Sequence, residues 1–294
     1  MVLERGTMFD PVLVKDLVSK VKGKSSLAVL SGQTPIPFNG KKEFTFTMDS
    51  EIDVVAESGA KSHGGVSVAP RTIVPIKVEY GARLSDEFMY ATEEEQISML
   101  EAFNDGFAKK VARGIDLMAF HGVNPRTGAA SAVIGENHFD NLVTQELSAT
   151  DNANADIETA VGLVQSSGEE VSGLAIAPAF RTSLAGLTKA DGNAMFPELA
   201  WGAAPQTLNG VRVDVNNTVS DMSTVNDLAV IGDFANAFKW GYVKEIPMEV
   251  IQYGDPDNSG LDLKGHNQVY IRSEMYLGWG ILVPEAFARV VEGA

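Results

Sequence analysis

One short acidic turn near the end of the chain has residue types that could bind a calcium ion. It places carboxylate and hydroxyl oxygens two residues apart, at Asp255, Asp257 and Ser259. Calcium-binding loops with this spacing need a bidentate glutamate at the twelfth position. Here the second position is Pro256 and the twelfth is His266, so the final ligand is missing. We therefore expect a polar hairpin turn at this place and no metal site.

The remaining groups that could do chemistry do not form a recognisable constellation. The chain has no cysteine, which excludes disulfides, thiolate metal sites and a cysteine nucleophile. It contains no nucleophile elbow, no phosphate-binding loop and no dinucleotide fingerprint. The histidines are not spaced as metal ligands on a helix or turn, so we expect scattered surface or core residues. They are His63, His121, His138 and His266. We predict no active site, cofactor or resident metal.

The composition indicates a folded protein that does not bind nucleic acid tightly. The 294 residues are 45% hydrophobic, which is enough for a substantial core in one or two domains. The formal net charge is −16, and there is no cluster of lysine and arginine that could follow a phosphate backbone. The first residues lack a basic segment followed by an apolar run, and no apolar stretch is long enough to span a bilayer. The sequence predicts neither a standard signal peptide nor a transmembrane helix.

The longest helical pattern, from Thr92 to Gly122, is the element on which the other segments are expected to depend. Thr92 and Glu95 have the spacing of a capping box. Apolar residues then recur at steps of three and four, which predicts one buried stripe. They are Ile97, Leu100, Phe103, Phe107, Val111, Ile115 and Met118. Gly106 and Gly114 interrupt the pattern, and helices usually carry such residues where another backbone approaches closely.

The segment before this helix is expected to be a small helical arm followed by an extended strap. Asp10 and Pro11 read as the start of a short helix whose apolar face includes Leu13 and Leu17. Residues 31–40 contain two prolines and predict an extended strap with little to pack on locally.

Two extended runs, 41–48 and 71–83, predict a long two-stranded arm. The first alternates Phe44 and Phe46 with polar residues, and the second contains Ile76. The intervening residues are rich in glycine, alanine and serine and include Lys61 and His63 at a flexible tip. An isolated hairpin is marginal in water because its apolar side has nothing to cover it. The arm therefore requires a partner surface, which another chain could supply.

The second half of the chain predicts a compact α/β unit followed by a return of long strands. The expected helices are 151–167 and 179–187, and the expected short strands are 174–178, 211–215 and 228–231. Two longer extended runs, 248–253 and 268–283, are joined by a polar turn.

Six stretches, in this order, carry a resemblance to a known family. They are 54–57, 82–88, 115–128, 207–213, 230–234 and 283–287. On these stretches the chain is similar to the major capsid proteins of tailed bacteriophages, which have the Hong Kong ninety-seven type of shell fold. The resemblance implies an α+β fold with an N-terminal arm, an E-loop hairpin, a P domain with a long spine helix and long strands, and an α/β A domain. It implies these boundaries: arm 1–40, E-loop 41–82, P domain 83–150, A domain 151–240, and return strands with the end of the A domain 241–294.

The resemblance also implies a structural protein and no enzyme. It predicts self-assembly, as hexamers and pentamers, into an icosahedral head that holds double-stranded DNA by enclosure only. The implied location is the virion, after assembly in the host cytoplasm, with portal, scaffolding and decoration proteins as further partners and no membrane. Because Met1 lies just before the arm, we expect a separate scaffolding protein or none. The residues expected to contact neighbouring copies are Leu13, Leu17, Phe44, Phe46, Lys61, His63, Ile76 and Trp201.

Some members of this family crosslink neighbouring copies covalently. The resemblance assigns that role to Lys61, Asn267 and Glu274, where the glutamate would take a proton from the amine that attacks the amide. The alternative is that all three are solvated polar residues, and Lys41 or Lys42 could compete with Lys61.

Two other functions remain open at this point. An encapsulin shell resembles the same fold but houses an enzyme cargo in place of a genome. A soluble α/β enzyme that uses the hairpin as a dimerisation arm is the second alternative.

Overall fold

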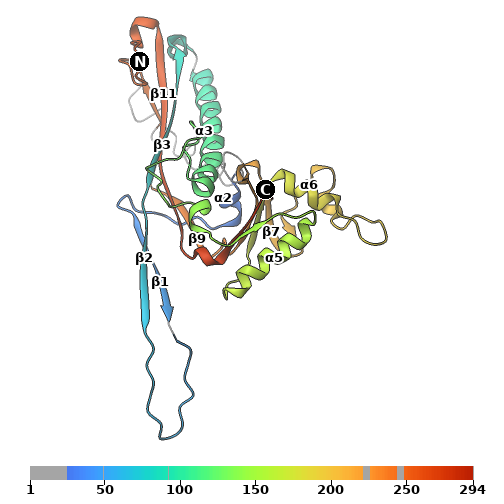
Figure 1. Ribbon diagram of the computed structural model, residues 1–294. Helices are drawn as coiled ribbons and strands as arrows, with labels where there is room; N and C mark the ends of the chain where they lie inside the picture. Colours follow the sequence, from blue (N-terminus) through green and yellow to red (C-terminus); the bar gives the residue numbers. More distant parts are fainter. Residues whose placement is uncertain (1–24, 49, 92, 221–225, 244–247, 294) are drawn as a thin grey trace.

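The computed structural model describes residues 25–48, 50–91, 93–220, 226–243 and 248–293, and its fold is α+β (Figure 1). The expected N-terminal helix, with Leu13 and Leu17, and the capping residue Thr92 lie outside the described residues. The α-helices are α2 (Ser26–Leu30), α3 (Glu93–His121), α4 (Phe139–Leu142), α5 (Ala153–Ser166) and α6 (Pro178–Gly186). The 3-10 turns are η1 (Asp86–Tyr90), η2 (Pro197–Gly202), η3 (Asn217–Val219), η4 (Lys264–His266) and η5 (Pro284–Ala286). The strands are β1 (Lys41–Met48), β2 (Val66–Ile73), β3 (Ile76–Ser85), β4 (Glu146–Ser148), β5 (Gly173–Ile176), β6 (Thr207–Leu208), β7 (Val211–Val215), β8 (Asp227–Gly232), β9 (Phe238–Tyr242), β10 (Met248–Ile251), β11 (Gln268–Ile281) and β12 (Phe287–Val291).

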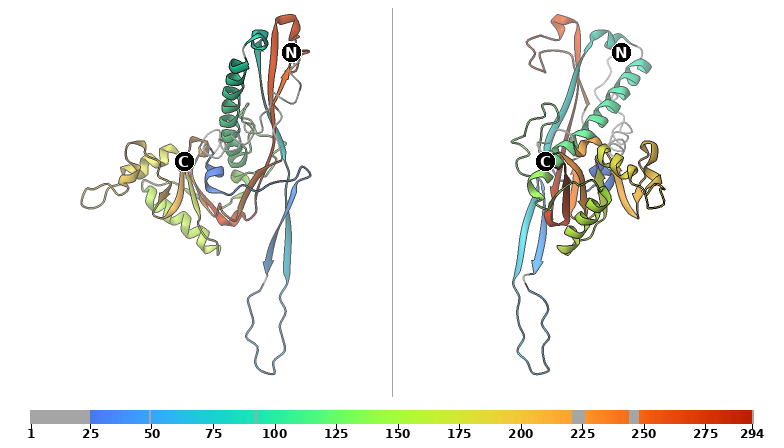
Figure 2. Two further views of the ribbon diagram at one scale, coloured as in Figure 1. Left: turned by 180° about the vertical axis from the view of Figure 1, so that it is seen from behind. Right: turned by 45° about the vertical axis from the view of Figure 1, so that its right-hand side comes forward.

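A long antiparallel sheet runs the length of the upper molecule, and helix α3 lies along it (Figures 1 and 2). Its central strand β11 pairs with β3 from Gln268 to Leu277 and with β9 from Leu277 to Ile281. Strand β10 pairs with the first part of β11. The two predicted C-terminal runs and the turn between them are confirmed, whereas β9 was not predicted.

Helix α3 agrees with the predicted helix to within one residue at each end. In its first half, Leu100 and Phe107 are buried while Ile97 remains largely exposed. From Val111 to His121 every residue except Arg113 is buried, because the six-stranded sheet closes over this half of the helix as well. The prediction of a single buried stripe is therefore wrong for the second half, which is part of the core on nearly all sides.

The prediction of a close backbone contact at the two helical glycines is also wrong within one subunit. A Cβ atom at Gly106 would meet no atom within 4 Å among the described residues. At Gly114 the nearest atom would be Pro125 Cγ at 3.5 Å, which is an ordinary van der Waals contact. Packing inside the subunit therefore does not explain the presence of glycine at these positions.

A second sheet of six strands, in the order β4-β12-β8-β5-β7-β6, confirms the predicted α/β unit. Alternate residues of its central strands face two different cores, as the two-residue period of a strand requires. Ala175, Val230 and Phe287 point to the core shared with α3, whereas Leu174 and Ile231 point to a second core under α5 and α6. The interior strand β12 comes from the C-terminal segment and lies between β4 and β8 (Figure 1). The sequence did not predict this strand, although the resemblance implied that 241–294 includes the end of the A domain.

The strap at residues 31–40, which was expected to have little to pack on locally, packs on a distant segment of the chain at the edge of the long sheet. Gln33 forms a bridge to Trp240, and the Thr34 N–H donates to Trp240 O at 2.8 Å. Ile36 is buried. A Cβ atom at Gly241 would overlap Thr34 O, so glycine at this position allows the close approach.

Strands β1 and β2 form an antiparallel hairpin that projects away from the rest of the subunit (Figures 1 and 2). The predicted arm therefore exists, but the extended run assigned to its second strand is divided between two sheets. The hairpin register pairs Lys41 with Ile73 and Met48 with Val66. At Val74 and Pro75 the chain leaves the hairpin and enters the long sheet as β3, whose pairing with β11 begins at Ile76.

Candidate subunit-contact site

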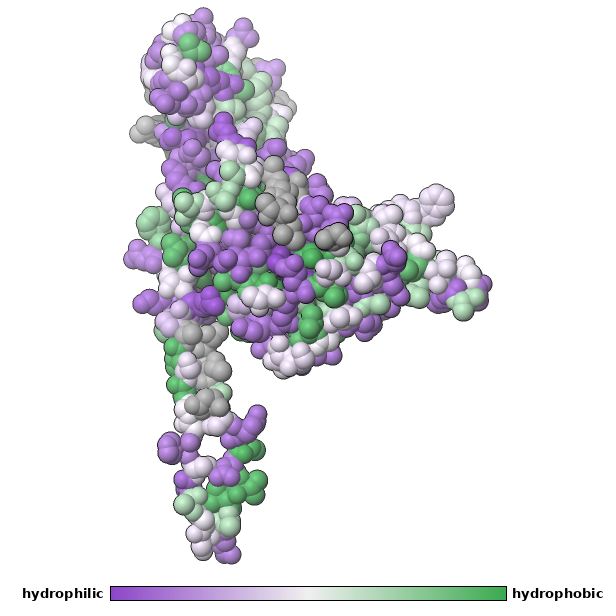
Figure 3. Space-filling view, viewed as in Figure 1, coloured by the Kyte–Doolittle hydropathy of each residue, from purple (hydrophilic) through white to green (hydrophobic). Residues whose placement is uncertain are grey.

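The projecting hairpin exposes apolar side chains over its strands and its loop (Figure 3). Ile52 and Val54 in the loop are each 95% exposed, and Phe44 on β1 is 65% exposed. Val66 and Val68 on β2 are more than half exposed. Burying a side chain of this kind stabilises an association by roughly 1.5–3 kcal/mol. The hairpin is thus an uncovered surface that a second molecule could bury.

The root of the hairpin, in contrast, is fixed to the subunit. Ile73 is buried against β11, where a Cβ atom at Gly280 would lie 2.9 Å from Ile73 Cγ1. Glu43 forms ion pairs with Lys41 at 2.7 Å and with Lys239 of β9 at 3.6 Å. The hydrogen bond from Lys41, together with the charge of Lys239, lowers the pKa of the Glu43 carboxyl despite its partial burial. The hairpin is therefore held at a defined direction while its far end is free of the subunit.

The residues predicted to contact neighbouring copies have different environments. Lys61 and His63 are exposed on the hairpin loop, and Trp201 is fully exposed on the α/β unit. Ile76 is half-buried and packs against the main core of its own subunit. The backbone of Phe46 pairs with Val68, but its side chain lies outside the described part of the structure.

One copy of the chain does not bring the three predicted crosslinking groups together. Asn267 lies just before β11 in a left-handed conformation (φ 53°), and its carbonyl accepts from the Asp86 N–H at 2.9 Å. Glu274 lies seven residues further along, about 23 Å away at the rise of a strand. Its carboxylate forms ion pairs with Lys77 at 2.9 Å and with Arg272 at 3.2 Å. The loop that carries Lys61 is at the opposite end of the molecule from the turn before β11 (Figure 1).

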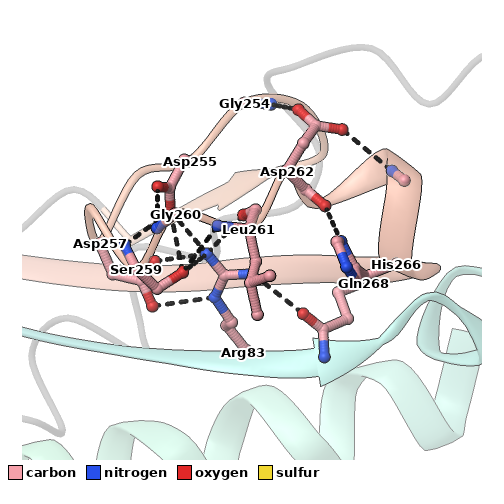
Figure 4. A network of polar contacts seen from close by, with 11 residues as sticks. Arg83, Gly254, Asp255, Asp257, Ser259, Gly260, Leu261, Asp262, His266 and Gln268 are labelled. Atoms are coloured by element: carbon pink, nitrogen blue, oxygen red, sulfur yellow. Dashed lines mark hydrogen bonds and ion pairs between the residues drawn. The ribbon is translucent and has the colours of Figure 1, made fainter.

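The polar turn between β10 and β11 is organised around Arg83 of β3 (Figure 4). Arg83 Nε donates to Asp257 at 2.9 Å, and Nη2 donates to Asp255 at 2.7 Å and to Ser259 at 2.6 Å. Nη1 donates to Gln268 Oε1 at 3.0 Å. The hydrogen bond and charge of Arg83 hold the pKa of the Asp257 carboxyl well below its usual range. The predicted polar turn is confirmed, and the oxygens that resembled a calcium loop bind a guanidinium group.

A buried polar cluster connects the end of α3 to the six-stranded sheet. His121 Nδ1 is 2.9 Å from Asp140 Oδ2, and Arg289 Nη1 donates to Asp227 Oδ1 at 2.9 Å and to Asp140 Oδ1 at 3.3 Å. Burial and the neighbouring Asp140 raise the pKa of Asp227. The histidine and two carboxylates are close enough to hold a metal ion. However, Arg289 already supplies a positive charge to both carboxylates and would repel a dication, so the cluster acts as a structural connection.

A second buried carboxylate, Asp116 of α3, fastens helix α2 and turn η3 to the spine helix. It accepts from the Ser25 hydroxyl, from the Ser26 N–H at 2.9 Å and from Thr218 Oγ1 at 2.8 Å. Burial raises the pKa of Asp116 to about 6, although these donors act in the opposite direction. This residue therefore joins three segments that are far apart in the sequence.

Comparisons with known proteins identify the fold. The chain matches the Phage capsid family over residues 6–291. Its structure is similar to one from Mycobacterium phage Ogopogo, with 34% identity, a TM-score of 0.79 and coverage of 92% of each chain. A structure from Gordonia phage Cozz has 24% identity and a TM-score of 0.74, over 92% of this chain and 87% of that chain. The capsid of an empty GTA particle has 13% identity and a TM-score of 0.64, over 92% of this chain and 90% of that chain. A comparison with curated proteins found no match.

The fold and the uncovered hairpin define a structural subunit of a viral shell. The chain belongs to the phage capsid family, and its function is that of a major capsid protein of the virion. The resemblance stated from the sequence is thus confirmed, and neither the encapsulin nor the soluble enzyme finds support. In the described part of the chain, no helix is both long enough and apolar enough to cross a membrane.

The sequence analysis missed two features of the structure, one on the hairpin loop and one in the turn between β10 and β11. It placed the hairpin tip at Lys61 and His63 and did not select Ile52 and Val54, which are the most exposed apolar side chains of the loop. The available signal was two β-branched residues on either side of Asp53, in a segment that fits no helix or buried strand. It also gave no role to Arg83, whose acidic partners are separated from it by more than 170 residues.

Proposed function

We propose that copies of this chain assemble as hexamers and pentamers into a closed icosahedral head that encloses the double-stranded DNA of a tailed phage. The observation that carries the proposal is the apolar hairpin, which is fixed at its root and uncovered along its length. A neighbouring copy that lies under the hairpin would bury Ile52, Val54 and Phe44. Because every copy in a symmetric shell makes the same contact, modest contacts add up to a stable container.

The proposal assigns DNA to the interior by enclosure and without tight binding. With a formal net charge of −16, the average surface repels a phosphate backbone. A low affinity for the wall lets the genome move during packing and release. Assembly in the host cytoplasm, and encounters with portal, scaffolding and decoration proteins, belong to the same proposal.

We expect the contacts between copies to be non-covalent. Glu274, the residue expected to take up the amine proton, is already engaged with Lys77 and Arg272. A crosslink between Lys61 and Asn267 would need a glutamate from a copy other than the one that supplies the asparagine. Denaturing electrophoresis of mature particles should therefore give a single band near the mass of one chain, 31.4 kDa. A ladder of multiples that is lost in Lys61→Arg would instead support the crosslink.

Electron microscopy and light scattering of the purified chain test the assembly itself. We expect closed shells above a threshold concentration, because the hairpin can be covered only by other copies. A small oligomer at all concentrations would overturn the proposal. Particles from infected cells should contain DNA, and particles filled with a protein cargo would favour an encapsulin.

A further inference from the structure

The turn that follows α6 presents a fully exposed tryptophan on an unfavourable backbone. Trp201 is at φ 57° and ψ 25°, after Ala200 at φ −63° and ψ 151°. These angles are close to the two central positions of a type II turn, where the second position favours glycine or asparagine. A bulky aromatic residue in this left-handed region costs energy that glycine would not. The glycine of this segment, Gly202, occupies the next position.

The surrounding packing holds this turn in place. Leu199 and Phe196 are buried in the core under α5 and α6. Arg181 Nη1 of α6 donates to Leu199 O at 2.8 Å. The backbone on the N-terminal side of Trp201 is therefore fixed, and binding at the indole ring would require little further ordering of the chain.

The chain from Trp201 onward is uncharged for several residues, and the nearest exposed charge before it is Glu198 in the same turn. Residues 200–205 contain no acidic or basic side chain, although the chain as a whole carries a formal net charge of −16. Two copies of such a chain repel each other over most of their surface, so they can approach most easily where the charge is absent. Tryptophan is also the residue type most enriched among the side chains that dominate binding energy.

We infer that Trp201 is a principal binding residue in the contact between the α/β units of two neighbouring copies of this chain. The inference rests on the proposed function and adds to it a specific residue on a surface separate from the hairpin. The indole ring packs on the adjacent copy and is shielded from solvent there. A second copy, and not a partner of another kind, is its occupant.

Tryptophan fluorescence provides a direct test, because the other two tryptophans, Trp240 and Trp279, are buried in the core. In the free subunit we expect one emission component that acrylamide quenches readily and that is absent from Trp201→Phe. In assembled shells of the wild-type chain this component should become protected from quenching. A component that stays equally quenchable in the shells would overturn the inference.

Replacing Trp201 by glycine separates the contribution of the indole ring to binding from the energetic cost of the left-handed backbone conformation. Trp201→Gly should leave the thermal unfolding temperature of the subunit unchanged or raised, since glycine relieves the left-handed conformation. The same variant should raise the assembly threshold at least about tenfold. Asn209→Gly is the matched control, because Asn209 is exposed on the same unit at φ 50° and its side chain has no aromatic ring. That control should assemble at the wild-type threshold.

The outcomes distinguish this inference from the proposed function. If the wild-type chain forms no shells, the proposed function fails and the inference fails with it. If the wild type and Trp201→Gly assemble at the same concentration, the inference alone is wrong. If protection from quenching occurs only when a different protein is added to complete shells, the occupant is that protein and the inference is again wrong.

Discussion

The turn between β10 and β11 of the long sheet and the loop of the β1–β2 hairpin lie at opposite ends of the subunit, and they complete their interactions in different ways (Figure 1). The turn between β10 and β11 is polar, and Arg83 binds its carboxylates, a hydroxyl and a backbone carbonyl (Figure 4). The loop between β1 and β2 exposes Ile52 and Val54, and its strands expose further apolar residues. The comparison teaches that a polar turn can satisfy itself within one chain, whereas an apolar ribbon needs surface from another copy.

The largest expected effect comes from removing the apolar character of the hairpin loop. The double variant Ile52→Ser and Val54→Ser should raise the assembly threshold by about a hundredfold, since each lost side chain removes roughly 1.5 kcal/mol or more of burial. Light scattering against concentration measures the threshold. The thermal unfolding temperature of the free subunit should stay within about 2 °C of wild type, because both side chains are exposed there.

Leu261→Ser provides the matched control for that variant. It makes a similar change at the opposite turn, where Leu261 is 47% exposed. We expect a much smaller change of the assembly threshold. If the two variants were equally defective, the distinction between the two ends of the subunit would be wrong.

A change inside the subunit should alter stability without altering the hairpin contact. Since folding raises the pKa of Asp116 from 3.8 to about 6, the folded chain binds the proton more tightly than the unfolded chain. The contribution of Asp116 to the free energy of unfolding is therefore highest below about pH 4, falls as the pH rises to about 6, and is then constant. The total decrease is about 3 kcal/mol.

The variant Asp116→Asn has no such titration. Its free energy of unfolding, measured by urea titration, should improve relative to wild type by about 3 kcal/mol between pH 4 and pH 7. Taking the difference between the two proteins removes the contribution of the other carboxylates. If the difference in free energy of unfolding between the two proteins stayed constant over this range, folding would not raise the pKa of Asp116. Under conditions where both proteins are folded, the assembly threshold should be the same.

The smallest expected effect is local and concerns Arg83. Arg83→Met should increase hydrogen exchange at the amides of Ser259 and Gly260, which donate to Asp255 at 3.0 and 2.7 Å in the intact turn. In the wild type the stabilisation of the turn by the Arg83–Asp257 ion pair should persist from pH 8 down to about pH 4 and be lost only on further acidification, because Arg83 lowers the pKa of Asp257. Arg83→Lys keeps the charge but not the forked geometry, and it should restore the protection only in part. Unchanged exchange in Arg83→Met would show that the turn is stable without the guanidinium.

Local patterns were reliable where a segment packs through its own periodicity. The bounds of α3, the strand β1 and the short strands β5, β7 and β8 follow from apolar spacing that each segment contains within itself. The failures occur where a distant segment intervenes. The run 71–83 reads as one strand, but Pro75 and the pairing with β11 divide it between two sheets.

Of the contact site, the sequence indicated the hairpin and the exposed Trp201 but not which side chains of the loop would be the most exposed. Exposure depends on what fails to pack, and a pattern within one segment gives no information about that. The buried polar residues were missed for the same reason, since His121, Asp140, Asp227 and Arg289 meet only after α3 and β12 are packed together.

The sequence by itself carried the resemblance to the capsid family, in the residues of six stretches along the chain. Its short-range periodicity also predicted most helices and strands, though not β9 and β12, and the presence of an apolar ribbon. Only the tertiary structure decided that the ribbon points away from the subunit, that the acidic turn binds Arg83 and that the second half of α3 is enclosed. These properties depend on contacts between residues far apart in the chain, whose energies are set by burial and charge in three dimensions.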